Sequence, residues 1–216
     1  ENSRIGYKFV EWKMEGGGSF NPDGKLTEDN IQLFADWTER TYTIKFADES
    51  GVLNNLTLEG VSYKDLISEP TAENCPIKDN YSFRAWTYTV GEDVYDWNFF
   101  AFTLENRGVI TSNSVTEFTL TASFGVKIQF VSEYDSIIGS AEPVVEDNTV
   151  YPVGYEYDLT KKVTGLHGYN FVGWSLVKND VEKIDSVILN QNTTVYAVWT
   201  KKEITIRFVT GDNEIE

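Results

Sequence analysis

Three short signatures recur along the chain in one fixed order, and this repetition constrains the fold more than any other feature of the sequence. The first is a glycine or asparagine followed by two aromatic residues and a tryptophan: GYKFVEW at 6–12, NYSFRAW at 80–86 and GYNFVGW at 168–174. The second is an alternating run that ends in a large aromatic residue: LFADW at 33–37, LTASF at 120–124 and VYAVW at 195–199. The third follows directly: TIKF at 43–46, KIQF at 127–130 and TIRF at 205–208. Ordered repetition of this kind predicts tandem modules.

The spacing of the signatures sets the expected module boundaries. Trp12 to Trp37 and Trp174 to Trp199 are each 25 residues, whereas the corresponding interval in the middle of the chain is 38 residues, so the middle module carries an insertion. We expect four segments: 1–39, the C-terminal part of one module; 40–125, a complete module with its insertion near 88–117; 126–201, a second complete module; and 202–216, the first strand of a following module.

Alternation of apolar and polar residues predicts that the signatures are strands with one buried face. In TIKF, for example, the apolar Ile44 and Phe46 flank the polar Lys45. A short helix is expected at 62–67, with Ser62 as its N-cap, and a second at 155–163. The predicted fold class is therefore α+β and β-rich, with modules of the order strand, strand, short helix, strand, strand.

The aromatic residues of the signatures allow two interpretations, a module core or a carbohydrate-binding surface. Their recurrence in every module favours the core, because each small module must fill the same interior. The expected core set is Tyr7, Phe9, Trp12, Trp37, Tyr81, Phe83, Trp86, Phe124, Tyr169, Phe171, Trp174 and Trp199.

The insertion at 88–117 is the more plausible place for a binding site, because it does not repeat. It is rich in aromatic residues, and those considered as contacts for a ligand or partner are Tyr88, Tyr95, Trp97, Phe99 and Phe100. The competing interpretation, which we favour, is an extended hairpin with its own minor core.

Composition argues against several classes of protein. With 34 acidic and 18 basic residues, the net charge of −16 disfavours nucleic acid and anionic membrane surfaces as partners. No apolar run approaches the length of about 20 residues that a membrane-spanning helix needs, so we expect no membrane insertion by this segment. Cys75 has no partner for a disulfide, and the single histidine, His167, is expected in a turn. Carboxylate pairs such as Asp93 with Asp96, or Glu182 with Asp185, are expected by chance on an acidic surface. We therefore predict no enzyme, no cofactor and no metal site.

The motif G-Y-x-F-x-x-W followed by V-Y-A-x-W-T resembles the Listeria-Bacteroides repeat, also seen as the internalin B-repeat, and residues 126–201 match it best. Asn80 in place of the motif glycine and Phe124 in place of the final tryptophan are departures in the middle module. The resemblance implies small β-grasp-like modules in tandem, in surface-anchored or secreted bacterial proteins, without catalytic residues.

Two functions follow as expectations. The first is a stalk or spacer in an adhesin-like extracellular protein at the bacterial cell surface, with neighbouring repeat modules as its contacts. The second is an adhesion module that binds a host or neighbouring-cell glycan or protein through the insertion at 88–117. The opening strand at 203–209 is expected to have an unpaired edge unless it pairs with its own array or with a neighbouring molecule.

Overall fold

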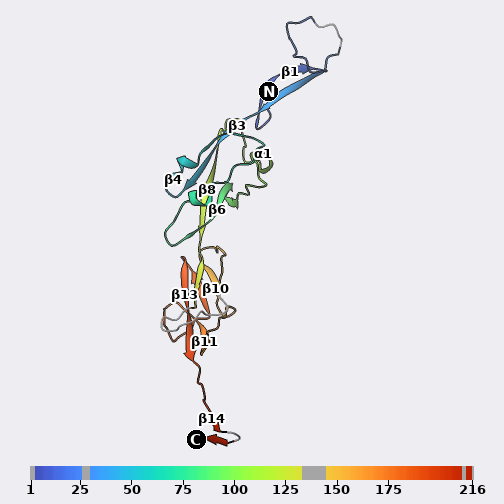
Figure 1. Ribbon diagram of the computed structural model, residues 1–216. Coiled ribbons are helices and arrows are strands. Elements are labelled where there is room, and N and C mark those ends of the chain that lie inside the picture. The colour runs from blue at the N-terminus through green and yellow to red at the C-terminus, as the bar shows by residue number, and fades with distance from the viewer. Residues whose placement is uncertain (1–2, 26–29, 133–144, 211–212, 216) are drawn as a thin grey trace. The chain divides into compact units, whose positions relative to one another are not determined.

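The computed structural model describes residues 3–25, 30–132, 145–210 and 213–215, and strands dominate throughout (Figure 1). The chain divides into two compact units. Unit 1 comprises Glu1–Pro76 and Arg84–Ser123, and unit 2 comprises Ile77–Phe83 and Phe124–Glu216. Within the described residues the helical elements are α1 (Leu104–Arg107) and two 3-10 turns, Asn54–Leu56 and Ala72–Asn74. The protein is thus β-rich, as the alternation predicts.

Unit 1 contains a two-stranded hairpin and a six-stranded sheet. The hairpin pairs β1 (Tyr7–Met14) with β2 (Leu33–Glu39). The larger sheet has the order β4-β3-β8-β6-β7, and β5 also pairs with β3. Its strands are β3 (Thr41–Asp48), β4 (Gly51–Val52), β5 (Leu58–Ser62), β6 (Ser82–Val90), β7 (Asp93–Asp96) and β8 (Glu117–Gly125). The alternation in β3 buries Ile44 and Phe46 completely, and β3 runs parallel to β8.

Unit 2 repeats part of this arrangement. Its main sheet has the order β11-β13-β9, which corresponds to β6-β8-β3 in unit 1, because the same signatures lie on corresponding strands. The remaining strands form two further pairs, β10 with β12 and β14 with β15. The bounds are β9 (Ile128–Val131), β10 (Tyr155–Asp158), β11 (Tyr169–Ser175), β12 (Ser186–Leu189), β13 (Thr193–Lys201), β14 (Phe208–Thr210) and β15 (Asn213–Ile215).

The hairpin β1–β2 and the pair β11–β13 share the same register. In both, the motif phenylalanine faces the final tryptophan, a bulge follows, and the motif tryptophan faces an alanine: Phe9↔Trp37 and Trp12↔Ala35, and Phe171↔Trp199 and Trp174↔Ala197. The repetition seen in the sequence is therefore also a repetition of backbone geometry.

The two predicted helices do not form, and the prediction was wrong at both places. Ser62 ends β5, where it pairs with Thr41, and the chain then turns. Residues 155–158 form β10, in which Tyr157 is 5% exposed and Tyr155 is 42% exposed. All four residues of β10 pair with β12, from Tyr155↔Leu189 to Asp158↔Ser186, so pairing with a neighbouring strand decided the local structure over helix propensity. The opening strand expected at 203–209 begins only at Phe208.

The motif tryptophans of the two larger sheets lie in equivalent packing positions. Trp86 and Trp174 are each 1% exposed. Phe46 meets the ring of Trp86 edge-on at 4.8 Å and 70°, and Phe130 meets Trp174 at the same distance and angle. Each tryptophan is therefore covered by the aromatic residue of the module's first strand.

The remaining motif residues differ in burial. Tyr7 and Trp199 are buried. The half-buried members are Trp37, Tyr81, Phe83, Phe124, Tyr169 and Phe171. Phe9 and Trp12 are each 38% exposed. In the described residues no strand lies beside β2 in the place that β9 takes beside β13, which explains why these two rings are more accessible than their counterparts.

Candidate functional site

The five aromatic residues singled out in the insertion do not share one surface. Tyr88, Trp97 and Phe99 are buried, and the ring of Trp97 meets Tyr88 edge-on at 5.4 Å. Tyr95 is 43% exposed and Phe100 is 86% exposed. Tyr95 lies on β7, which is the edge strand of the sheet. Tyr95 and Phe100 are thus the two members of the set that a partner can reach.

The second half of the insertion folds onto the sheet through helix α1. Thr103 caps the helix, because its hydroxyl oxygen accepts a hydrogen bond from the backbone N–H of Asn106. In return, the side-chain oxygen of Asn106 accepts a hydrogen bond from the backbone N–H of Thr103. Leu104, the first residue of the helix, is completely buried. The guanidinium of Arg107 donates to the Tyr88 hydroxyl, with Nε at 2.8 Å, and lies over the ring of Phe102. The insertion is therefore in large part an extension of the core of unit 1.

The same insertion also contacts the hairpin β1–β2, which precedes it in the sequence. The Tyr7 hydroxyl donates to Glu105 Oε1 at 3.0 Å, and the Tyr7 ring meets Tyr63 edge-on at 5.8 Å. Asn113 Oδ1 accepts from the backbone N–H of Gly6 at 3.1 Å. Arg40 donates from Nε to the Tyr7 carbonyl at 3.1 Å. We call this set of contacts, made by Gly6 and Tyr7, the tyrosine junction.

One hydrogen bond of the motif glycine recurs at Gly168, and its backbone conformation recurs at both other motif positions. The backbone N–H of Arg40 donates to the Gly6 carbonyl at 2.9 Å, and that of Lys202 donates to the Gly168 carbonyl at the same distance. The three motif positions all adopt left-handed backbone, with φ of 80° at Gly6, 64° at Asn80 and 81° at Gly168. Asparagine is a non-glycine residue that accepts this conformation, which accounts for its presence in the middle module.

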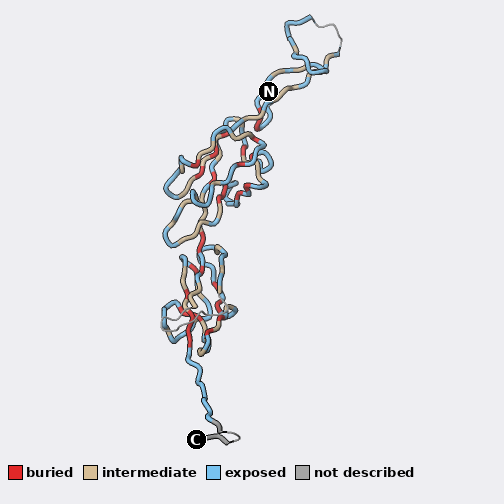
Figure 2. The backbone as a smooth tube through the Cα atoms, in the orientation of Figure 1, coloured by how far each residue is buried: buried red, intermediate tan, exposed pale blue. Residues whose placement is uncertain are grey.

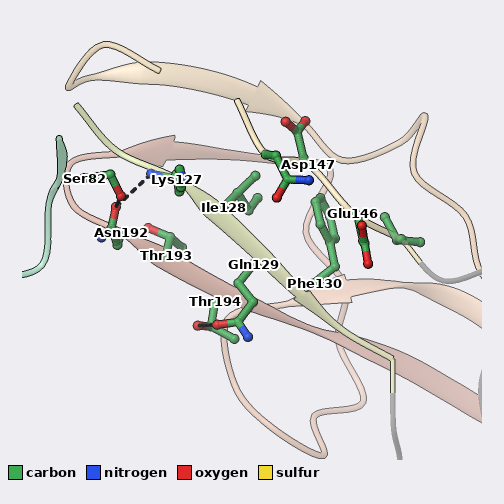
Figure 3. A pocket seen from close by; sticks show the side chains of 12 residues that line it. Ser82, Lys127, Ile128, Gln129, Phe130, Glu146, Asp147, Asn192, Thr193 and Thr194 are labelled. Carbon is green, nitrogen blue, oxygen red and sulfur yellow. Dashed lines mark hydrogen bonds between the residues drawn. The ribbon is translucent and has the colours of Figure 1, made fainter. Parts of the chain in front are cut away.

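A polar pocket of about 560 Å³ lies in unit 2, between β9, β13 and residues 145–148 (Figure 3). Asn192 stands at one end, where its Oδ1 accepts from the backbone of Lys127 at 2.8 Å and from the Ser82 hydroxyl at 3.2 Å. Gln129 and Thr194 project from neighbouring strands, with their side-chain oxygens 3.5 Å apart. The described lining offers amides, hydroxyls and the carboxylates of Glu146 and Asp147, and its one aromatic ring, that of Phe130, is half-buried.

Asp147, at the rim of this pocket, is occupied by hydrogen bonds within unit 2. It accepts from the hydroxyl of Tyr157 at 2.6 Å, the hydroxyl of Tyr151 at 3.0 Å and the backbone of Thr149 at 3.0 Å. Burial opposes ionisation of the carboxyl, but these donors outweigh it and hold the pKa of Asp147 well below its usual range. Burial and the neighbouring carboxylate raise the pKa of Tyr157. Asp147 is therefore a structural anion.

Other groups with catalytic or ligating chemistry are dispersed. His167 is exposed in the turn that precedes β11, as predicted. Asp96 receives both terminal nitrogens of Arg84, at 2.7 and 2.9 Å, and Asp185 pairs with Lys183 at 2.6 Å. Over the described ranges, no group of three or more His, Cys, Asp or Glu side chains is placed to hold a metal ion. The described part of the chain also contains no helix of the length and apolarity that crossing a membrane requires.

Sequence reasoning did not identify the residues that form the tyrosine junction. Tyr63, Glu105 and Asn113 are far from Tyr7 in the sequence and belong to no repeated pattern. The only signal was the motif tyrosine itself, which recurs at each module end.

Comparison with known proteins supports a repeat architecture. The family model of the Listeria-Bacteroides repeat domain matches residues 42–107 and 128–198. A protein of Evansella cellulosilytica named "Putative membrane protein" is 27% identical over 181 residues, which cover 82% of this chain and 24% of that protein. The chain therefore spans about a quarter of the length of this relative. No solved structure was found to match the chain.

Proposed function

Because the chain belongs to the Listeria-Bacteroides repeat family, we propose that it is a non-catalytic segment of an extracellular bacterial protein, cell-surface or secreted. In this role, small β-grasp-like modules act as a stalk or spacer that holds another part of an adhesin-like protein away from the cell. Repeat proteins of this kind depend on contacts between neighbouring modules.

The observation that carries the proposal is the tyrosine junction. A spacer needs connections that resist bending, and a short connection alone does not supply this. Tyr7 is only 6% exposed, because the following sheet and the insertion enclose it. Its hydroxyl and its backbone carbonyl are hydrogen-bonded, and so is the backbone N–H of Gly6. The hairpin β1–β2 and the sheet that follows it are therefore expected to move as one body.

This expectation is tested by nitrogen-15 relaxation on the whole chain. The amides of β1 and β2 should report the same rotational correlation time as those of β3 and β8. Tyr7→Ala together with Asn113→Ala should shorten the correlation time of the hairpin alone. The matched control is Tyr95→Ala, which removes an exposed tyrosine of unit 1 that makes no junction contact. Independent tumbling of the hairpin in the unaltered chain would contradict a stiff spacer.

A second function, binding of a host or neighbouring-cell glycan or protein, is favoured by one specific observation. Tyr95 and Val94, on the edge strand β7, are 43% and 63% exposed, and Phe100 in the same insertion is 86% exposed. Accessible aromatic side chains beside a free strand edge suit contacts with sugars or with an added peptide strand.

The binding function calls for point substitutions, because deleting the insertion would also remove the buried Trp97, Leu104 and Ile110. The double variant Tyr95→Ser, Phe100→Ser leaves that core intact. Binding of the unaltered chain to glycan and matrix-protein arrays, lost in the double variant but kept in the control Val181→Ser, would support adhesion. No binding by the unaltered chain would leave the spacer role as the better account. Val181 is a suitable control because it is 84% exposed and lies outside the insertion.

A further inference from the structure

Strand β7 has a free edge in the described part of unit 1. It pairs with β6 on one side, and no other described strand pairs with it on the other side. All four of its residues are exposed, and they are pale blue in Figure 2. Strand β6 corresponds to β11, and no described strand of unit 2 takes the place of β7 beside β11. The strand is therefore an addition to the repeated arrangement, within the insertion.

The backbone of β7 directs hydrogen-bonding groups to this free edge. The N–H of Trp97 donates to the carbonyl of Trp86 at 2.8 Å, directly beyond the last pair of the register, Thr87↔Asp96. Hydrogen-bonded and non-hydrogen-bonded pairs alternate between antiparallel strands, so Val94 and Asp96 belong to non-hydrogen-bonded pairs. Their N–H and C=O groups point away from β6 and have no backbone partner among the residues described. An added strand binds through groups of this kind.

Side chains on both faces of β7 offer further contacts. Tyr95 is 43% exposed, and its ring lies 5.7 Å from the buried ring of Tyr88, so it continues the core of unit 1 to the edge of the sheet. Val94 projects from the opposite face and is 63% exposed. An apolar residue of an added strand would extend the core if it lay opposite Tyr95.

The charges at this edge determine which partner fits it. Asp96 is neutralised by Arg84, whose two terminal nitrogens contact both carboxylate oxygens. Glu92 and Asp93, at the adjoining turn, are exposed, and neither is paired with a basic side chain in the parts of the chain that the structure describes. A second copy would bring the same carboxylates and a net charge of −16, which opposes self-association through this edge. A strand with a basic residue opposite Asp93 is favoured instead.

We propose that β7 accepts an extended segment of another protein, with a basic residue opposite Asp93 and an apolar residue opposite Tyr95. The segment adds antiparallel to β7, since that pairing is the more stable one per residue. Its backbone bonds to the outward groups of Val94 and Asp96, and its side chains supply specificity. The inference rests on the binding function of the insertion and names its partner class as a basic, extended peptide.

The test uses the whole chain and a labelled, capped peptide, Ser-Thr-Val-Thr-Lys-Lys, in fluorescence anisotropy. In the proposed register its two threonines lie opposite Asp96 and Val94, and its valine lies opposite Tyr95. Methylation of both threonine nitrogens should abolish binding, because these N–H groups face β7. Methylation of the valine nitrogen, which faces away, should leave binding unchanged. Hydrogen exchange at the amides of Val94 and Asp96 should slow when the unmodified peptide binds.

Two variants of the chain separate strand addition from attraction by charge alone. Val94→Pro removes one outward N–H and leaves the pairing with β6 intact, so it should weaken binding about tenfold, as for one lost hydrogen bond. Asp93→Lys should weaken binding of this peptide and strengthen binding of the analogue with glutamate in place of both lysines. Its matched control is Glu182→Lys, which changes the net charge equally at an exposed position outside the insertion and should bind like the unaltered chain.

Binding that survives both threonine methylation and Val94→Pro would overturn the proposal, since the peptide would then be held by charge alone. Absence of peptide binding at millimolar concentration would also overturn it. In that case, retention of glycan binding that depends on Tyr95 and Phe100 would show that the binding function itself stands. Loss of both kinds of binding would overturn the binding function as well.

Discussion

Substitution of Gly6 by alanine tests the tyrosine junction most directly. A Cβ atom at this position would lie 2.2 Å from two ring carbons of Tyr63, and the φ of +80° is itself unfavourable for alanine. The left-handed backbone should cost about 1–2 kcal/mol. Displacement of a packed ring should add about 1–3 kcal/mol. We therefore expect Gly6→Ala to lower the free energy of local opening at the junction by about 2–5 kcal/mol.

Native-state hydrogen exchange measures this free energy at the amide of Arg40, which donates to the Gly6 carbonyl. Gly168→Ala is the matched control: its φ is +81°, but an added Cβ meets no atom within 4 Å. Gly168→Ala should lower the free energy of local opening only by the cost of the left-handed backbone, about 1–2 kcal/mol. The equivalent amide at which to measure it is that of Lys202. In a Tyr63→Ala background, Gly6→Ala should likewise lose its steric part. Full additivity of Gly6→Ala and Tyr63→Ala would refute the reasoning, because the clash requires both side chains.

Two further predictions concern the core. Asp147→Asn should destabilise unit 2 by about 1–3 kcal/mol at neutral pH, because the Tyr151 and Tyr157 hydroxyls lose a charged acceptor. The folded-state pKa of Asp147 is lowered, so its contribution is complete above the unfolded value near 4 and is lost as the pH falls towards the folded pKa. Denaturant titrations of the two proteins should therefore converge as the pH drops from about 5 towards 2; a difference that does not change with pH would contradict this. Trp174→Ala should cost about 3–5 kcal/mol and Trp12→Ala clearly less, measured by the same titration, since Trp174 is buried and Trp12 is 38% exposed. Equal costs would contradict the inference that the loss of stability follows the burial of each tryptophan.

Repetition made the main strands predictable from the sequence. The signatures TIKF and KIQF lie on β3 and β9, and the alternating runs lie on β2, β8 and β13. A recurring period of two reflects the burial of one strand face, and this is a local property that the sequence displays.

The helices predicted at 62–67 and 155–163 failed because a capping residue and a nearby proline are weak signals. At Ser62, the pairing of β5 with β3 supplied hydrogen bonds that a short helix would have had to replace. The one α-helix among the described residues lies instead in the insertion, where Thr103 and Asn106 form the cap.

Burial in the insertion was not predictable for a different reason. Whether Tyr88, Tyr95 or Phe100 faces the core depends on which strand lies beside β6 and on the position of α1, and both are set by distant parts of the chain. The tyrosine junction has the same origin, since Glu105 and Asn113 meet Tyr7 only after the sheet has formed.

The parallel pairing of β3 with β8 has a mechanical consequence. Five consecutive residue pairs, from Thr43↔Glu117 to Ala47↔Thr121, join the first and last strands of one module. When such a module is pulled at its two ends, parallel terminal strands slide along each other, so their hydrogen bonds are strained together rather than opened one after another. β9 and β13 have the same geometry, with four pairs. Tension along the chain should therefore meet a shear-type clamp in each sheet, and single-molecule extension should show one abrupt rupture per clamp instead of gradual unzipping.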